Sequence, residues 1–371
     1  MTHKIAVTSA FGVESVTKKE LKNLGVRDPK AIDGSFVFDG TMRDVSRLNV
    51  FLRTGDRVHL VLKEFPARSF DELFDGVKSV PFSDYLPTDA RIIVNGKSVK
   101  STLYSLSDCQ KIIKKAILSR LSEDKRTTYF PESGPTYEVL FSIRNDLVTL
   151  SLNTSGKGLH KRGYRDLVGD APIKETLAAA LVALSPIDAE RPFVDPFCGS
   201  GTLLIEAATA AMHIAPGISR DFDFLHWNFF DKKLYEETIE EAKSGEKKQK
   251  LPFAGYDVDP SAIKLALRHA ERAGIREYVH LQARDVKDLS HAKSHGCIVT
   301  NPPYGERLLT EREALELYKT FGDVCKRLDQ WSINVITSAK GFERAFGKKA
   351  DRNRKLFNAN KECRFYQYDR L

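Results

Sequence analysis

The sequence predicts an α/β protein in which a parallel, doubly wound sheet of Rossmann type follows a smaller α+β region. Three observations lead to this prediction. Strand and helix patterns alternate regularly from about residue 170 onward, which is typical of a parallel sheet covered by helices. Shorter strand and helix patterns, with one hairpin, precede that point. A glycine-rich turn joins a strand to an apolar helix at residues 195–202, the kind of turn that opens a ligand site in such sheets.

Composition and charge narrow the class of protein. Of the 371 residues, 42% are hydrophobic and 29% are charged, as expected for a globular chain of two or three domains. The longest uncharged apolar run, Thr176–Leu184, is far shorter than the roughly 20 residues that span a bilayer, and the N-terminus has no signal-peptide pattern. Five cysteines without CxxC spacing predict reduced thiols in a cytoplasmic protein. The net charge of +8 suits a polyanionic partner, most often nucleic acid.

Residues 1–65 predict a small α+β domain. Apolar alternation and helical spacing indicate strands at 4–8, 36–38 and 58–62 and helices at 13–24 and 42–52. This βαβαβ order resembles half of a ferredoxin-like domain.

A second unit is predicted at residues 66–153. Its expected elements are a helix, a strand, a basic amphipathic helix and a two-stranded hairpin, at 70–80, 90–94, 108–121, 139–143 and 147–152. A glycine-rich, cationic linker follows at 154–170, and we expect the third and largest domain to occupy 171–371.

The first motif of the third domain is a strand, a turn and a helix. Phe193-Val-Asp195 runs into Pro-Phe-Cys-Gly199-Ser-Gly201, and an apolar helix begins at Thr202. Glycines permit a tight turn and close approach of a ligand, and a helix N-terminus adds unpaired N–H groups. The D-x-x-x-G-x-G spacing differs from the G-x-G-x-x-G of dinucleotide-binding folds, and the next acidic strand end lies about 55 residues on instead of about 20. We expect an insertion at 213–250, irregular and then charged.

Acidic residues follow the next two strands. Asp257 ends one strand and can accept hydrogen bonds from both hydroxyls of a ribose. Asp259 precedes Pro260 and is better placed to cap the following helix. Asp285 follows the strand at 279–282, where a carboxylate can accept an adenine amino group. Each alone fits a helix cap, but together, at successive carboxyl ends of a parallel sheet, they predict a nucleoside-sized pocket.

The fourth strand, Cys297–Thr300, runs into Asn301-Pro-Pro-Tyr304. Two prolines keep the backbone extended and rigid, which suits a site that holds the Asn301 oxygen and a backbone carbonyl at a fixed separation. Tyr304 adds an aromatic face. An exocyclic amine on a flat base needs such a site, because two accepted N–H hydrogen bonds favour a more tetrahedral, more nucleophilic nitrogen. Beside the nucleoside pocket, the tetrad therefore predicts a base amine as the substrate group.

These motifs resemble those of class I S-adenosylmethionine-dependent methyltransferases. Asp195–Gly201 resembles motif I, and Asn301–Tyr304 resembles motif IV of the amine-methylating branch. Over the whole chain, including Leu159–Arg165 and Asn301–Arg307, the sequence is similar to the THUMP-domain RNA methyltransferases of the RlmL family, which methylate guanine N2 in 23S rRNA. The resemblance implies a Rossmann-like methyltransferase fold with seven strands, the last antiparallel, after a ferredoxin-like and THUMP region.

The resemblance also implies the cofactor and the roles of individual residues. Asp257 matches the ribose-binding acid and Asp285 the adenine-contacting acid of S-adenosylmethionine. Cofactor contacts are expected from Asp195, Phe197, Cys198, Gly199, Gly201, Thr202, Asp257, Val258, Asp285, Val286 and Asn301. The target amine is expected to bind Asn301, Pro302, Pro303 and Tyr304. Cys198 is expected to be a compact turn residue, and no metal is expected, because His291, His295 and Cys297 lack zinc spacing.

RNA, most specifically 23S rRNA, is the expected partner, and basic residues in three places are its candidate contacts. They are Lys111, Lys114 and Lys115 on the helix at 108–121, Lys161, Arg162 and Arg165 in the linker, and Arg307 after the tetrad. The helix lysines fit a solvated face equally well.

Alternatives stay open at this stage. The tetrad recognises an amine and not a particular base, so guanine N2 of tRNA and adenine N6 of DNA are alternative substrates. A more distant alternative is an inactive RNA-binding module, against which the intact glycines and acids argue. RlmL proteins carry a second methyltransferase module, and since this chain ends at Leu371, we expect that second activity to be absent.

Overall fold

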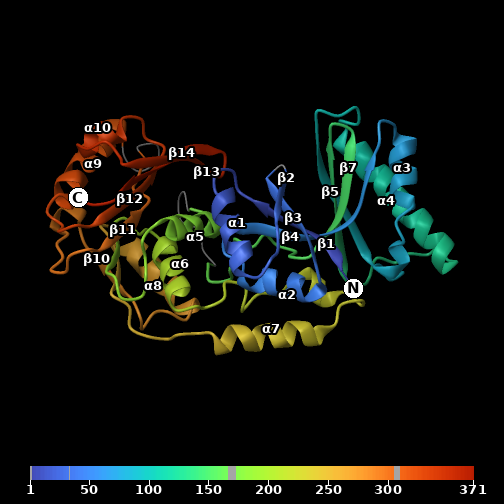
Figure 1. The fold of residues 1–371 in the computed structure, drawn as a ribbon, viewed down its shortest axis with the longest axis horizontal. Coiled ribbons are helices and arrows are strands. Elements are labelled where there is room, and N and C mark those ends of the chain that lie inside the picture. Colours follow the sequence, from blue (N-terminus) through green and yellow to red (C-terminus); the bar gives the residue numbers. More distant parts are fainter. Residues whose placement is uncertain (1, 33, 166–172, 305–309) are drawn as a thin grey trace.

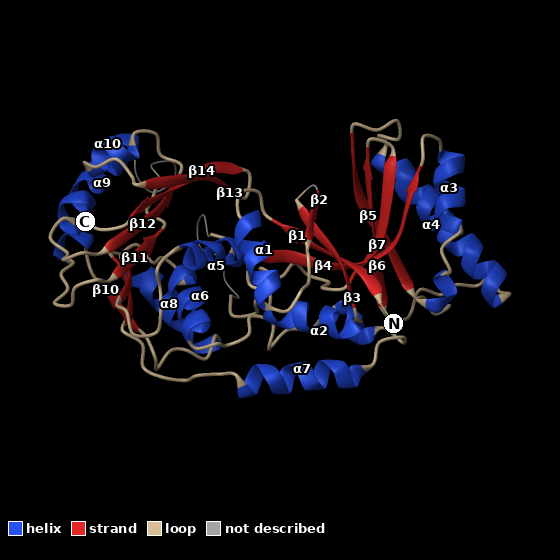
Figure 2. Ribbon diagram, viewed as in Figure 1, coloured by secondary structure: helices blue, strands red, loops and turns tan. Residues whose placement is uncertain are grey.

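The computed structural model describes residues 2–32, 34–165, 173–304 and 310–371 and divides the chain into two lobes, each built on a seven-stranded sheet (Figure 1). The front lobe, residues 2–153, contains the blue and teal N-terminal part of the chain. The C-terminal lobe, residues 173–371, is coloured from green to red; because the sequence motifs predict the active site there, we call it the catalytic lobe. Figure 2 shows the two sheets beside each other, with helices packed against both.

The front sheet joins the two predicted N-terminal units. Its strand order is β2-β3-β1-β4-β7-β6-β5. The first unit supplies β1 (His3–Ser9), α1 (Glu14–Asn23), β2 (Lys30–Ile32), β3 (Ser35–Gly40), α2 (Met42–Phe51) and β4 (Gly55–Pro66). The second supplies α3 (Phe70–Lys78), β5 (Arg91–Val99), α4 (Leu106–Lys125), β6 (Thr136–Arg144) and β7 (Leu147–Asn153).

The long strand β4 connects these units. Leu60 of β4 pairs with Ile5 of β1 on one side and with Leu152 of β7 on the other. The boundary predicted at residues 65 and 66 therefore falls at the end of a shared strand. Both units also contribute to one hydrophobic core, so they form a single folded body.

The insertion predicted at 213–250 is more ordered than its sequence indicated. It contains a 13-residue helix, α7 (Lys232–Ser244), which Figure 1 shows in yellow beneath α2. Buried aromatic side chains at 222–230, with Trp227 only 1% exposed, join the core of the front lobe. Arg43 and Arg47 of α2 form ion pairs with glutamates of α7. The insertion thus belongs to the catalytic domain in sequence but packs on the front lobe.

The catalytic sheet has the order β10-β9-β8-β11-β12-β14-β13. Its parallel strands are β8 (Phe193–Asp195), β9 (Phe253–Asp257), β10 (His280–Ala283), β11 (Cys297–Thr300) and β12 (Ser332–Thr337), while β14 (Lys361–Tyr368) runs antiparallel to β12 and to β13 (Arg352–Asn358). The helices are α5 (Glu175–Leu184), α6 (Thr202–Ala211), α8 (Pro260–Arg272), α9 (Glu311–Cys325) and α10 (Phe342–Phe346). This confirms the predicted fold.

Two hydrophobic clusters hold the catalytic lobe together, and they engage largely different helices. One joins α5, α6 and α8 to the strands, and the other joins α9 and α10 to them. Because the carboxyl ends of the parallel strands meet at one edge, the residues after β8, β9, β10 and β11 are brought together there. Among the described helices, none combines the length and apolar character needed to cross a bilayer.

Candidate active site

The turn after β8 forms the floor of the candidate site. Gly199 and Gly201 have φ of +50° and +83°, a backbone conformation that glycine adopts without steric cost. A Cβ added to Gly199 would meet no atom within 4 Å, so open space lies next to the backbone at that position. Gly201 occupies the N-cap position of α6, and no side chain caps the N–H groups of the first turn. The turn therefore offers backbone donors beside an open space, which suits a polar ligand.

Asp257 at the end of β9 is tied to this turn. Its Oδ2 accepts a hydrogen bond from the Gly199 N–H at 2.9 Å, and its Oδ1 accepts one from the Asp259 N–H at 3.0 Å. Two bonds to backbone fix the carboxylate at the strand end while its side chain stays half-buried. Asp259 caps α8, as predicted, by accepting from the Ser261 N–H at 2.8 Å.

Asp195 lies beneath the turn and braces it. The residue is only 1% exposed, and its Oδ1 accepts from the Thr300 hydroxyl at 2.6 Å and from the Phe197 N–H at 3.3 Å. Burial raises the pKa of this carboxyl to about 7, against the opposing effect of those two hydrogen bonds. The carboxylate thus joins β8 to β11 and positions the turn, while a contact between Asp195 and the cofactor stays a prediction.

The next strand ends supply an acid and an apolar surface. Asp285 accepts from the Lys287 N–H at 3.0 Å, and this backbone bond, more than the nearby Lys287 charge, lowers the pKa of the carboxyl. Val258, between two acidic residues, is 72% exposed, which is unusual for an aliphatic side chain. Val258 directly follows Asp257 at the end of β9, and Asp285 follows the neighbouring strand β10, so an exposed aliphatic side chain at this edge fits the flat face of a nucleoside. Among the other predicted cofactor residues, Phe197 is half-buried, and the side chains of Cys198, Thr202 and Val286 are buried.

The Asn301–Tyr304 tetrad follows β11 directly. Pro302 is buried, and the Pro303 carbonyl accepts from the Tyr318 hydroxyl of α9 at 2.6 Å. The Asn301 Oδ1 accepts a hydrogen bond from the Tyr304 hydroxyl. Burial raises the pKa of the Tyr304 phenol well above its ordinary value, so the hydroxyl stays protonated and donates. The sequence predicted only a stacking face for Tyr304, and this bond to the acceptor of the site is new.

A cation from a distant part of the chain also contacts the tetrad. The Nζ of Lys361, at the start of β14, lies 5.1 Å from the centre of the Tyr304 ring, within the range of a cation–π interaction. Nothing in the local sequence joins these two residues. Only the antiparallel return of β14 along β12 brings Lys361 to the edge where the parallel strands end.

The predicted RNA contacts differ in accessibility. Lys111, Lys115 and Lys161 are exposed, and Lys114 is ion-paired with Glu132. The structure corrects the prediction for the two linker arginines, which form ion pairs inside the protein: Arg162 with Glu206 of α6, side chains 4% and 2% exposed, and Arg165 with Glu175 of α5, side chains 10% and 5% exposed. Arg307 lies outside the described residues.

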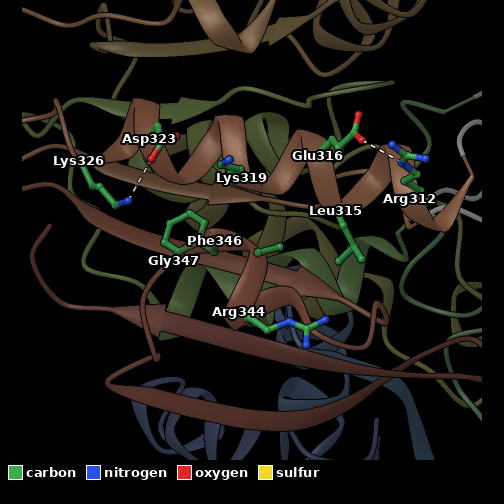
Figure 3. Close-up of a pocket in the computed structure, with 10 residues that line it drawn as sticks. Arg312, Leu315, Glu316, Lys319, Asp323, Lys326, Arg344, Phe346 and Gly347 are labelled. Carbon is green, nitrogen blue, oxygen red and sulfur yellow. Dashed lines mark hydrogen bonds and ion pairs between the residues drawn. The ribbon is translucent and has the colours of Figure 1, made fainter.

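Neither the thiol of Cys198 nor the pocket between α9 and α10 belongs to the predicted reaction centre. Burial raises the pKa of the Cys198 thiol well above its ordinary value, so the thiol is a poor nucleophile there. Figure 3 shows a separate pocket between α9 and α10, where Arg312 pairs with Glu316 and Lys326 with Asp323 around Leu315 and Phe346. None of the predicted site residues lines that pocket. Across the described residues, no group of three or more His, Cys, Asp or Glu side chains is arranged to hold a metal.

Comparison with known proteins gives this site its family. Residues 162–367 match the family described as the RMKL-like methyltransferase domain, residues 4–59 match the RlmL ferredoxin-like domain, and residues 67–153 match the THUMP domain. The chain belongs to the RMKL-like methyltransferase family. This confirms the resemblance drawn from the sequence motifs.

Relatives of known sequence cover nearly the whole chain. It is 41% identical over 369 residues to the putative RNA methyltransferase YpsC of Bacillus subtilis, which covers 99% of this chain and 96% of that protein. It is 33% identical over 365 residues to the ribosomal RNA large subunit methyltransferase K/L of Shewanella baltica, covering 96% of this chain. The chain spans about half of that relative, 52% of its length.

Solved structures share the fold over the same extent. A predicted N6-adenine-specific DNA methylase from Listeria monocytogenes is 44% identical, with a TM-score of 0.95, covering 99% of this chain and 96% of that one. The putative methyltransferase SMU.472, solved with S-adenosylhomocysteine, is 38% identical with a TM-score of 0.94, covering 99% and 98%. TrmN from Thermus thermophilus, at 16% identity and a TM-score of 0.72 over the whole of both chains, shares the fold.

S-adenosylmethionine is the cofactor of this family, and the residues present fit it. Gly199 leaves open space beside the backbone, Asp257 fixes a carboxylate at the end of β9, and Val258 exposes an aliphatic face between acids. Backbone donors, a fixed carboxylate and an exposed aliphatic face are the kinds of group that can bind a nucleoside with a charged tail. The individual contacts of each residue stay predictions.

Proposed function

We propose that this protein transfers a methyl group to an exocyclic amine of an RNA base, and specifically to guanine N2 of 23S rRNA. The observation that carries the proposal is the tetrad Asn301–Tyr304, which lies at the carboxyl end of β11 beside the turn and the acids of the cofactor site. The THUMP match and the relatives named as RNA methyltransferases support RNA as the substrate. The name of the Shewanella relatives supports large-subunit ribosomal RNA.

The tetrad would act by holding the amine and its base. When bound, S-adenosylmethionine supplies a methyl group on a positively charged sulfur. The Asn301 Oδ1 and a tetrad carbonyl accept the two N–H hydrogens of the amine, which directs the nitrogen lone pair toward the methyl carbon. The Tyr318 hydroxyl of α9 donates to the Pro303 carbonyl at 2.6 Å. This bond holds the tetrad backbone that carries the two acceptors in a fixed position.

Asn301 must exchange one donor for another during substrate binding. In the structure its Oδ1 accepts from the Tyr304 hydroxyl, so the amine N–H replaces a hydrogen bond that the free enzyme already makes. The Asn301 oxygen therefore has a hydrogen-bond donor both before and after the amine binds. This avoids the free-energy cost of an unpaired acceptor in a half-buried site. Tyr304 can then stack its ring on the base after its hydroxyl moves away.

The transfer needs no strong base. As the nitrogen forms a bond to the methyl carbon, the carbon–sulfur bond breaks and its electron pair stays on sulfur. The methylated amine becomes acidic and loses one proton to the Asn301 oxygen, a carbonyl or water. For a base within a helix, extrusion into the pocket costs a few kcal/mol of unstacking.

Single-turnover methyl transfer from labelled cofactor to saturating, unmodified RNA tests the proposal. We expect Asn301→Ala to slow transfer by roughly 10²–10³ while cofactor affinity stays within a few-fold. Asn23→Ala, an exposed asparagine at the end of α1, is the matched control and should react at the parent rate. If Asn301→Ala transfers methyl groups at the parent rate, the tetrad is not where the reaction occurs.

The substrate itself is settled by mapping the labelled nucleoside. The protein is incubated in parallel with unmodified ribosomal RNA, tRNA and DNA, and the product nucleoside is identified after digestion. N2-methylguanosine in large-subunit RNA is the expected product. Label in tRNA would show that tRNA, and not ribosomal RNA, is the substrate. N6-methyladenine in DNA would agree with the name of the Listeria structure and contradict the RNA assignment.

A further inference from the structure

The positive charge of the chain is concentrated near its C-terminus. Residues 340–364 contain nine Lys or Arg and three Asp or Glu, a surplus of six within a chain whose net charge is +8. This stretch covers α10, β13 and the first half of β14. The sequence motifs of the methyltransferase do not account for this concentration.

The antiparallel pairing divides these cations between the two edges of the catalytic sheet. Arg364 pairs with Thr337, the last residue of β12, so the turn between β13 and β14 lies at the edge where the parallel strands end. Lys355 pairs with Arg364 across the hairpin and Lys361 lies at its tip, so both belong to the same edge. Lys349, at the other end of the hairpin, belongs to the opposite edge.

Aromatic rings alternate with the cations at the active-site edge. Phe11, from the loop between β1 and α1 of the front lobe, is 62% exposed. Its ring meets the ring of Phe357 edge-on, with centres 5.5 Å apart. The Nζ of Lys355 lies 5.4 Å from the Phe357 ring centre, and the Nζ of Lys361 lies 5.1 Å from the Tyr304 ring centre.

The front-lobe loop is held firmly against the hairpin. Arg354 of β13 donates to the Gly12 carbonyl at 3.0 Å and to the Ser15 hydroxyl at 3.1 Å. A Cβ on Gly12 would lie 2.5 Å from the Lys355 carbonyl, so only glycine permits this approach. Phe11 is therefore exposed to solvent although its backbone is fixed. Ordering it on a ligand costs little backbone entropy.

We propose that Phe11, Lys355, Phe357 and Lys361, here named the hairpin surface, bind a single-stranded stretch of RNA beside the target base, which Tyr304 itself would hold. Aromatic faces stack unpaired bases without regard to sequence, and the lysines between them neutralise phosphates. The Lys355 Nζ pairs with the Glu362 carboxylate at 2.7 Å and would exchange that partner for a phosphate. A strand is the fitting partner because extruding one base leaves its neighbours partly unstacked at this edge. The inference rests on the proposed RNA substrate and names which part of that RNA the edge would hold.

Binding of two labelled probes to the full-length protein tests this surface. The probes are a 12-nucleotide single-stranded RNA of mixed sequence and a 12-base-pair RNA duplex, each carrying fluorescein. Phe11→Ala should weaken binding of the single strand by roughly five- to tenfold and leave the duplex within twofold. Lys361→Gln should lower the slope of log affinity against log salt by about 0.7, the value for one phosphate contact on a single strand.

Matched variants control for surface changes of the same kind. Tyr129→Ala removes an aromatic side chain that is 75% exposed on the front lobe, and Lys349→Gln removes a cation from the other end of the hairpin region. Both should bind the two probes as the parent does. Cofactor affinity of all four variants, measured by calorimetry, should equal that of the parent, which shows that the fold and the cofactor site are intact.

The outcomes separate this inference from the proposed function. If the parent methylates RNA and Phe11→Ala and Lys361→Gln bind the single strand as the parent does, the hairpin surface is refuted and the proposed function stands. If single-strand binding falls as expected but RNA is never methylated, the surface stands and the proposed substrate fails. Equal losses for the strand and the duplex, or losses in Tyr129→Ala and Lys349→Gln, refute a single-strand site.

Discussion

Replacing Arg162 should unfold the protein more readily instead of weakening RNA binding. Its guanidinium lies 3.4 Å from the Glu206 carboxylate, with side chains 4% and 2% exposed, and it also donates to the carbonyls of Leu159 and Arg53. Tyr164 donates to the same carboxylate at 3.2 Å. The group thus joins the linker and the front lobe to α6, the helix that begins at the cofactor turn.

The burial of both side chains determines how much unfolding free energy each variant should lose. Arg162→Met leaves the Glu206 carboxylate buried with the Tyr164 hydroxyl but without the cation of its ion pair. Removing one member of a buried pair costs about 3–5 kcal/mol of unfolding free energy. Glu206→Gln should cost a similar amount. The double variant leaves neither charge buried, so its loss should fall short of the sum of the single losses by at least about 2 kcal/mol.

Urea unfolding followed by circular dichroism measures all three variants, and the neighbouring Lys161 supplies the contrast. Lys161 is exposed, so Lys161→Gln should leave the unfolding free energy within about 0.5 kcal/mol. It should lower the salt slope of RNA affinity by about 1 if the residue contacts phosphate. Additive losses, or a single loss under about 1 kcal/mol, would refute the reasoning about the buried pair.

Three further predictions concern the active site. Asp257→Ala should weaken S-adenosylmethionine binding by about 1–3 kcal/mol in calorimetry, whereas Asp259→Ala should cost about 1 kcal/mol of stability through the lost cap of α8 and leave cofactor affinity unchanged. The raised pKa of Asp195, about 7 against an ordinary 3.8, means that the folded state holds the proton more tightly. The stabilising contribution of the protonated carboxyl is full below about pH 4 and is lost as pH rises to about 7. In urea unfolding, the stability of the parent should therefore fall relative to that of Asp195→Asn by up to about 4 kcal/mol over that range. A difference that stays constant with pH would show that Asp195 titrates normally. Tyr304→Ala should weaken RNA binding by about 1–3 kcal/mol through lost stacking, while Tyr304→Phe should bind RNA at least as well as the parent; equal losses in both would make the hydroxyl the essential group.

Much of the catalytic fold could be predicted because its signals are local. Buried strands appear as short apolar runs, and the turn after Asp195 and the tetrad after Thr300 follow their strands directly. Sequence patterns did not indicate β2, because its three residues are too few to show an alternation of apolar and polar side chains. It also took α7 for an irregular insertion, because a helix with many charges resembles a solvated loop until its partner helix α2 is known.

The functional details that were missed depend on long-range contacts. Arg162 was expected at the RNA surface because its neighbours in sequence are basic, and only the fold places Glu206 against it. Lys361 meets Tyr304 across 57 residues of sequence, and Phe11 meets Phe357 across 346. A single sequence carries no local pattern for such pairs. Sequence motifs identify residues with the chemistry that the reaction needs, whereas the order of the strands determines which of these residues are in contact.

The packing of residues 222–242 on the front lobe has a consequence for biosynthesis. Trp227, Phe224 and Ala242 belong to the hydrophobic core of the front lobe, although more than 60 residues separate them from the end of β7. A growing chain therefore emerges with β8 and the cofactor turn before the first lobe can complete its interior. Domain-by-domain folding, the usual course for multidomain chains, would therefore leave the interior of the front lobe without these side chains until residues 222–242 have been synthesised.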